Sequence, residues 1–170
     1  MTEKVIRKAS CPVLTVPPRA QATSQLPFRR ILCPIDFSAS STRALQFALS
    51  IAQEAEADLH LLHVIEWPAD RQPPRLPGFN LPEYRVYRES EALAELSKLV
   101  PAPAHDWCQP TMRVVDGRPY EQILQVAASS GVDLIVIGVH GRNALDLMIF
   151  GSTTNPVIRG ATCPVLTIRS

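Results

Sequence analysis

An unbroken apolar run that ends in glycines constrains the fold of this chain more than any other feature. Residues 134–137 (LIVI) lead directly into Gly138 and Gly141. A continuous apolar run is typical of a strand buried on both faces of a parallel sheet. Glycines at its end allow a sharp turn that leaves backbone N–H groups facing an anion. Residues 151–153 (GST) then predict a helix start with hydroxyl and N–H donors, so we expect a phosphate cradle at the carboxyl end of this strand.

Strands and helices alternate along the chain. Apolar runs predict five strands, at residues 30–36, 58–65, 111–115, 133–138 and 164–168. Apolar stripes with helical spacing predict helices at residues 41–56, 83–99, 119–131 and 153–160. This alternation implies right-handed crossovers and an open parallel sheet with helices on both faces. The proline-rich segment 67–82 is expected to be a loop, because proline lacks the N–H that helices and central strands use.

The order of the strands decides where a ligand would bind. In open α/β sheets, ligands gather at the carboxyl ends of strands where the winding direction switches. Asp36 follows the first expected strand and Gly138 ends the fourth. If those two strands are neighbours, the acid and the glycines share one crevice.

The N-terminus repeats the C-terminus. Residues 2–16 match residues 154–168 at ten of fifteen positions, at an offset of 152 residues. An offset of one domain length predicts that residues 1–18 are the remnant of a preceding copy, its last helix and fifth strand. A linker rich in proline and polar residues follows at 19–28, and the complete domain occupies 29–170. We expect the remnant strand, residues 12–16, to pair with an exposed fifth strand, within one chain or between chains.

Composition argues against several classes of function. The chain has 170 residues, 46% of them hydrophobic, and a formal net charge of +1. No global field therefore attracts nucleic acid or an anionic membrane, and any anion site must be local. The apolar runs are far shorter than the roughly eighteen residues of a membrane span, and the first residues lack the apolar core of a signal peptide. We therefore expect a cytoplasmic protein.

The cysteines and histidines show no metal-binding pattern. The four cysteines are widely separated and are expected to be small buried side chains. His60 and His63 lie three apart on an expected strand, so they face opposite sides and are not expected to share a metal ion.

The spacing of the glycines supplies a more specific indication. Gly138 and Gly141 are followed, after nine residues, by Gly151 and Ser152, which is the pattern G-x2-G-x9-G-(S/T). This pattern resembles the ATP-binding branch of the universal stress protein family. Further similarities lie at residues 33–38 (CPIDFS), 62–64 (LHV), 117–124 (GRPYEQIL) and 162–166 (TCPVL).

The resemblance implies a fold and a ligand. The fold is a Rossmann-like, five-stranded parallel sheet of order 3-2-1-4-5, usually dimeric through antiparallel contact of the fifth strands. The ligand is ATP, with magnesium or manganese. Asp36 and its neighbours would line the adenine and ribose, Val64 would contact the base through its backbone, and the glycines would hold the phosphates. The implied binding residues are Pro34, Ile35, Asp36, Val64, Ile137, Gly138, His140, Gly141, Arg142, Gly151, Ser152 and Thr153.

Each of these residues also has a simpler explanation. Gly138 and Gly141 could serve only a turn, Asp36 could cap the helix that begins near Ser38, and Arg142 could be a solvated surface charge. His140 is better explained as a surface residue than as a catalytic base, because no nucleophile accompanies it.

Two positions depart from the family pattern. Thr153 stands where the family usually has valine, which keeps a hydrogen-bond donor. Pro156 falls within the short last helix, where it is harmless in the first turn but could change which amides face a phosphate.

The function that these features favour is ATP binding by a regulatory stress-response module with slow or no hydrolysis. The chain has no Walker-type lysine, general base or arginine finger in the glycine pattern. The alternative is a dimerisation or protein-interaction module of the same fold that binds no nucleotide. A nucleotidyl-transfer or electron-transfer enzyme is less consistent with the chain, which lacks an HxGH motif and a flavin loop.

Overall fold

A mostly parallel sheet forms the centre of the computed structural model, which describes residues 5–6, 8–18, 20, 26–66, 80–108, 110–139 and 152–169. Within these residues the sheet has six strands in the order β1-β6-β5-β2-β3-β4. Their bounds are β1 Val13–Thr15, β2 Arg30–Pro34, β3 Asp58–Ile65, β4 Thr111–Asp116, β5 Leu134–Gly138 and β6 Val165–Ile168. Strands β2 to β6 pair in parallel, in the order β4-β3-β2-β5-β6. Numbered one to five along the chain, these strands have the expected order 3-2-1-4-5, which confirms the fold class. The sixth strand, β1, adds to the five expected and pairs antiparallel with β6.

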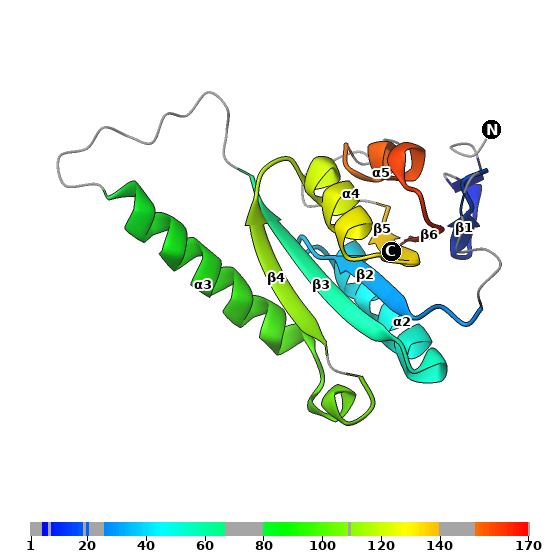
Figure 1. Cartoon of the computed structure of the whole chain (residues 1–170), viewed down its shortest axis with the longest axis horizontal. Coiled ribbons are helices and arrows are strands. Elements are labelled where there is room, and N and C mark those ends of the chain that lie inside the picture. Colours follow the sequence, from blue (N-terminus) through cyan, green and yellow to red (C-terminus); the bar gives the residue numbers. More distant parts are fainter. Residues whose placement is uncertain are drawn as a thin grey trace.

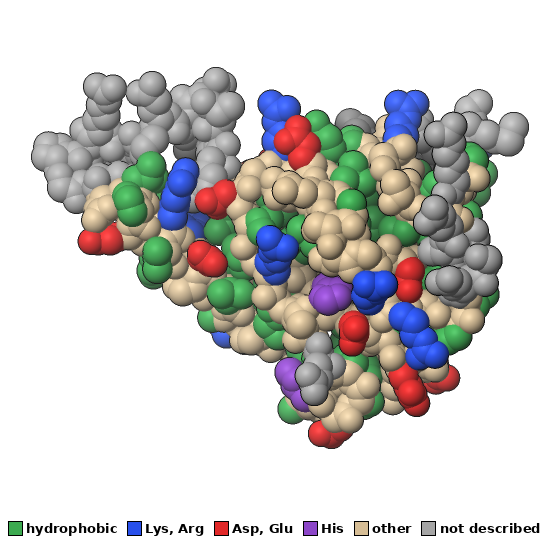
Figure 2. All heavy atoms as spheres, viewed as in Figure 1, with side chains coloured by type: hydrophobic (Ala, Val, Ile, Leu, Met, Phe, Trp, Pro, Cys, Tyr) green, Lys and Arg blue, Asp and Glu red, His purple; other side chains and the backbone are tan. Residues whose placement is uncertain are grey.

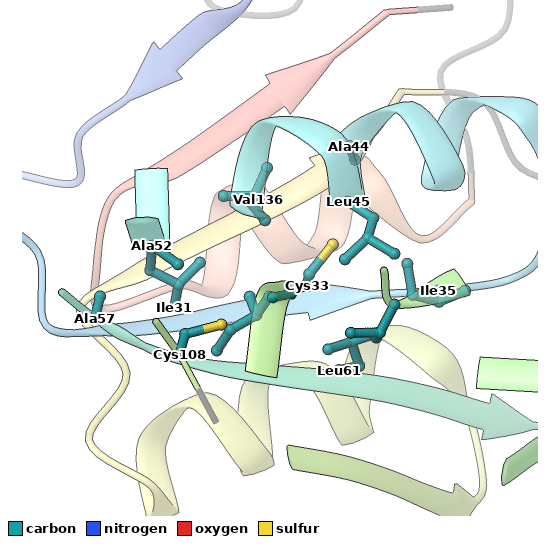
Figure 3. Close-up of a cluster of buried hydrophobic side chains, with 14 of the residues drawn as sticks. Ile31, Cys33, Ile35, Ala44, Leu45, Ala52, Ala57, Leu61, Cys108 and Val136 are labelled. Atoms are coloured by element: carbon teal, nitrogen blue, oxygen red, sulfur yellow. The ribbon is translucent and has the colours of Figure 1, made fainter. Parts of the chain in front are cut away.

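The helices cover both faces of the sheet (Figure 1). Their bounds are α2 Ala39–Ala55, α3 Leu81–Leu99, α4 Pro119–Ser129 and α5 Thr154–Gly160, with a short 3-10 helix, η2, at Ala102–Asp106. One apolar core lies under α2, α3 and η2, and a second lies under α4 and α5. Figure 3 shows the first of these cores, in which Leu45 of α2 packs towards Cys33 and Leu61 of the sheet. Two buried faces explain why β2 and β5 are apolar without alternation.

The start of α3 corrects the expectation of a loop up to residue 82. The helix begins at Leu81, and Pro82 lies in its first turn. The first N–H groups of a helix have no partner within it, so a proline there removes no hydrogen bond. The rest of the expected loop, residues 67–79, lies outside the described residues.

The cysteines correct a second expectation, that all four are buried. Cys33, Cys108 and Cys163 are buried, whereas Cys11 is exposed. Burial raises the pKa of the Cys33 thiol and raises the pKa of Cys163 to about 11. The pKa of Cys108 is raised by burial and by the charge of Asp58. These three thiols are therefore poor nucleophiles at neutral pH, because the thiolate is the reactive form.

Two further surface properties bear on function. Acidic and basic side chains are interspersed over the face shown in Figure 2, as expected for a net charge near zero. Among the described residues, the structure contains no helix that is both long and apolar enough to cross a membrane.

The attachment of α3 gives a test of the core. Within the helix only Ala92 and Leu96 are buried, and Leu96 is 0% exposed whereas Val86 is 66% exposed. We expect Leu96→Ala to lower the free energy of unfolding by about 2–5 kcal/mol, because it leaves a cavity under the helix. Val86→Ala should change it by less than about 0.5 kcal/mol. Urea unfolding followed by circular dichroism measures both, and equal effects would contradict this packing.

Candidate functional site

The two central strands separate at their carboxyl ends. β2 and β5 pair through Ile31 with Leu134 and through Leu32 with Ile135, and their pairing ends there. After β2 the chain enters α2 and crosses to β3, and after β5 it crosses through α5 to β6 on the other side. This is the switch in winding direction at which open α/β sheets form a crevice.

A cleft lies at this place. Its volume is about 110 Å³, several times the roughly 15 Å³ that one water molecule requires, so it can admit part of an organic ligand. Its lining comes from the ends of β2, β3 and β5 and from the starts of α2, α4 and α5. The lining residues are Pro34, Ile35, Asp36, Ser41, Leu62, Val64, Glu66, Pro119, Ile123, Ile137, Gly138 and Thr153.

Seven of the twelve expected binding residues line this cleft. They are Pro34, Ile35, Asp36, Val64, Ile137, Gly138 and Thr153. Ser152 is exposed and is not among the lining residues. The other four, His140, Gly141, Arg142 and Gly151, lie outside the described residues, as does the cradle expected from them.

Asp36 has a structural role in addition to its place in the cleft. Its Oδ1 accepts hydrogen bonds from the backbone N–H of Ser38 at 3.0 Å and from the Ser38 hydroxyl at 2.6 Å. Ser38 is the N-cap of α2, and its own hydroxyl oxygen accepts from the Ser41 N–H at 3.2 Å. Asp36 therefore does not cap α2 itself but orients Ser38, the residue that does, and it also lines the cleft.

The backbone beside Asp36 is held in an uncommon conformation. Phe37 has φ +63°, the left-handed region that non-glycine residues rarely adopt. Its ring lies 4.6 Å from the ring of His63, centroid to centroid. His63 is buried, and its Nδ1 donates to the Ile35 carbonyl oxygen at 2.7 Å. Such conformations cost about 1–3 kcal/mol and persist where the surroundings fix them, often at functional sites.

Gly138 is required by the packing of α2 against the end of β5. A Cβ at Gly138 would lie 2.4 Å from Ser40 Oγ and 2.8 Å from the Ser40 backbone carbon. The carbonyl oxygen of Gly138 also accepts a hydrogen bond from Thr154 Oγ1 at 2.9 Å. The glycine therefore brings the start of α2 close to β5, a reason that glycine spacing alone did not reveal.

The start of α5 differs from the expected hydroxyl-capped helix. Thr153 occupies the N-cap position with φ −95° and ψ −45°, and it makes no side-chain capping hydrogen bond. Its near-helical backbone is not the extended conformation in which a threonine oxygen reaches the first-turn amides. Pro156 is the third residue of α5 and so lies in the first turn, where its missing N–H breaks no helical hydrogen bond.

Five lining residues were not expected from the sequence. They are Ser41, Leu62, Glu66, Pro119 and Ile123. Pro119 and Ile123 begin α4, which follows the end of β4 at the same edge of the sheet. Ligands gather at the carboxyl ends of strands, and this rule applies to β4 as it does to β2 and β5. The order of the elements therefore already indicated that the start of α4 could line the cleft.

These observations define a doubly wound α/β protein whose candidate site lies at the carboxyl edge of its sheet. The model of the universal stress protein family matches residues 27–169, and the chain belongs to this family.

Individual relatives agree with the family. Universal stress protein YxiE of Bacillus subtilis is 32% identical over 147 residues, which cover 84% of this chain and 99% of that protein. Universal stress protein MT2061 of Mycobacterium tuberculosis is 29% identical over 170 residues, 99% of this chain and 55% of that protein. The solved structure of UspA from Lactobacillus plantarum has a TM-score of 0.71 and 26% identity, and covers 84% of this chain and 98% of that chain.

The contact between Gly138 and Ser40 can be tested with a second glycine as the control. We expect Gly138→Ala to lower the free energy of unfolding by about 1–3 kcal/mol, because the new methyl group meets backbone. At Gly160 the added Cβ would meet Leu124 Cδ1, the end of a flexible side chain that can move aside. Gly160→Ala should therefore be neutral or slightly stabilising. Thermal and urea unfolding measure the free energy of unfolding of both variants. A Gly138→Ala protein as stable as the unaltered chain would refute the packing role of Gly138.

Proposed function

We propose that this protein binds an adenine nucleotide, with ATP as the preferred form, in the cleft at the carboxyl edge of its sheet. The observation that carries the proposal is convergence. Seven residues that the glycine pattern and the family resemblance single out come from three strands and one helix start, and they line one cleft. The fold brings these strand ends to one edge of the sheet, and the agreement between the lining residues and the family pattern supports a shared binding role.

The chemistry of the cleft suits a nucleoside. Its walls include the apolar side chains of Pro34, Leu62, Val64, Ile123 and Ile137. The faces of a purine ring are apolar, and a ligand site commonly combines such walls with a few polar groups that fix orientation. Backbone groups at the end of β3, beside Val64, would recognise the polar edge of the base.

Asp36 is suited to the ribose hydroxyls. A charged carboxylate is a strong acceptor for hydroxyl groups, and Asp36 Oδ1 accepts two hydrogen bonds from Ser38. Those bonds fix the orientation of the side chain at the start of α2. An acid at a strand end binds ribose in dinucleotide folds for the same reason.

The phosphates would extend towards Thr153 and the segment that follows Gly138. Thr153 lines the cleft, and its hydroxyl makes no bond to its own helix start. His140, Gly141, Arg142 and Gly151, with the neighbouring Ser152, complete the proposed phosphate site. When bound, a magnesium or manganese ion would neutralise part of the phosphate charge.

Binding is proposed without rapid turnover. The titratable residues among those that line the cleft are the acids Asp36 and Glu66. Lysine, the residue that stabilises transferred phosphate in P-loop enzymes, is absent from the lining within the described residues. The proposal is therefore a regulatory module that holds the nucleotide in the cytoplasm.

The alternative, an interaction module that binds no nucleotide, has one observation in its favour. The packing of Gly138 against Ser40 accounts for that glycine without any ligand. A test of nucleotide binding therefore has to measure the affinity for the nucleotide and the stability of the fold separately.

Titration calorimetry and thermal shift with ATP and magnesium test the proposal. We expect binding by the unaltered chain and an affinity about tenfold or more lower for Asp36→Asn, which loses a charge-assisted hydrogen bond but keeps an oxygen for Ser38. Asp116→Asn is the matched control, because Asp116 also ends a strand at this edge but is not among the lining residues.

A second pair of variants tests the apolar wall. Val64→Phe fills the cleft and should abolish binding, whereas Val115→Phe, at the position paired with Val64 on β4, lies outside the lining and should bind normally. Absence of heat and of thermal shift at millimolar ATP with the folded, unaltered protein would reject nucleotide binding and favour the interaction module.

A further inference from the structure

The N-terminal segment covers the edge of the sheet at β6. β1 lies beside β6 at the end of the sheet (Figure 1) and pairs with it antiparallel. Ile6, in the segment that precedes β1, is 2% exposed, so the segment is held by a buried side chain as well as by strand pairing.

The register of this pairing matches the internal repeat. Leu14 pairs with Leu166, which is its own equivalent in the repeat at an offset of 152 residues. On either side, Val13 pairs with Thr167 and Thr15 pairs with Val165. β1 has the sequence Val-Leu-Thr, and residues 165–167 of β6 have the same sequence. A second copy of β6, placed on β6 in this register, would present the same residue at each of the three positions.

One hydrogen bond distinguishes the two strands. Thr167 Oγ1 donates to the Val13 carbonyl oxygen at 3.1 Å. Its repeat equivalent, Thr15 Oγ1, is buried and has no hydrogen-bond partner among the described residues. β1 therefore pairs with β6 as the β6 strand of a second copy would, but with one side-chain hydrogen bond fewer.

We propose that the β6 edge is a surface for a second copy of this chain and that residues 5–16 occupy it in place of that copy. Residues 5–16 compete with a second copy for the edge of β6, and the full chain therefore does not self-associate through this strand. The proposal does not depend on nucleotide binding.

The competition strongly favours the segment. Fourteen residues, 16–29, connect β1 to β2 and can extend to about 46 Å. A short tether gives an effective concentration in the millimolar range, so at about 10 µM protein the segment outcompetes an identical strand of another molecule by roughly 100-fold. β1 itself has three residues, and very short edge strands are poor templates for further pairing.

Deletion of residues 1–18 tests the proposal. The full chain is expected at monomer mass by light scattering with size-exclusion chromatography at about 10 µM. The deleted chain is expected to dimerise, and an added peptide of residues 5–18 should return it to monomer mass. A dimeric full chain, or a deleted chain that stays monomeric with a folded circular dichroism spectrum, overturns the proposal.

A substitution in the deleted chain identifies the surface. Leu166→Glu places two carboxylates opposite each other in the pair of β6 strands and should restore the monomer. The control, Val86→Glu, adds the same charge at an exposed residue of α3 and should leave the dimer intact. A dimer that survives Leu166→Glu uses another surface, which also overturns the proposal.

If the deleted chain is insoluble, the full chain provides the same test. Proline at both Leu14 and Thr15 removes two successive N–H groups, one of which faces β6 because alternate residues of a strand point their N–H groups to opposite edges. This variant should gain a concentration-dependent dimer. If it remains monomeric at about 100 µM, where a released edge has to pair, the proposal fails.

Discussion

The separation of β2 and β5 determines the rest of this structure. The two strands pair over two residues and then direct the chain into helices on opposite sides of the sheet. A doubly wound sheet has such a divergence, because right-handed crossovers that place helices on both faces proceed outward in two directions from one point. The divergence leaves backbone ends, a carboxylate and apolar side chains around one cleft. Here the fold itself produces the site.

Close contacts hold the rim of this cleft in place. Gly138 admits the start of α2, Thr154 bonds to the carbonyl of Gly138, and Asp36 supports the helix cap. The buried His63 fixes the Ile35 carbonyl, and Phe37 takes a left-handed turn beside it. Ile35, Asp36 and Gly138 thus take part in these contacts and also line the cleft. A substitution that weakens ligand binding here has to be judged against its effect on stability.

The sequence predicted the sheet and much of the cleft, for identifiable reasons. Apolar runs and helical stripes report burial, which is a local property, and so the strands from residue 30 onward were accessible. Their order, and with it the position of Asp36 opposite Gly138, was implied by the resemblance to the family. Contacts between distant residues were not. The hydrogen bond from His63 to Ile35, the approach of Ser40 to Gly138 and the wall formed by Ile123 depend on tertiary packing that no local pattern encodes.

The errors have equally specific causes. The helix start at Leu81 was missed because proline suggests a loop, although the first turn of a helix accepts it. Cys11 was expected to be buried like its repeat equivalent Cys163, but Cys11 is exposed beside a strand at the edge of the sheet. The repeat predicted that β1 would meet β6, and the three-dimensional structure supplied the register.

Amide chemical shifts during an ATP titration with magnesium locate a bound nucleotide, and so they test the claim that its site is the carboxyl edge of the sheet. The claim predicts that the largest shifts fall at the carboxyl ends of the strands and at the start of α5, on Asp36, Val64, Gly138 and Thr153. The amides at the opposite ends of the same strands, those of Arg30, Asp58 and Leu134, should change little. An unchanged spectrum at millimolar ATP, or shifts confined to those opposite ends, would contradict the claim.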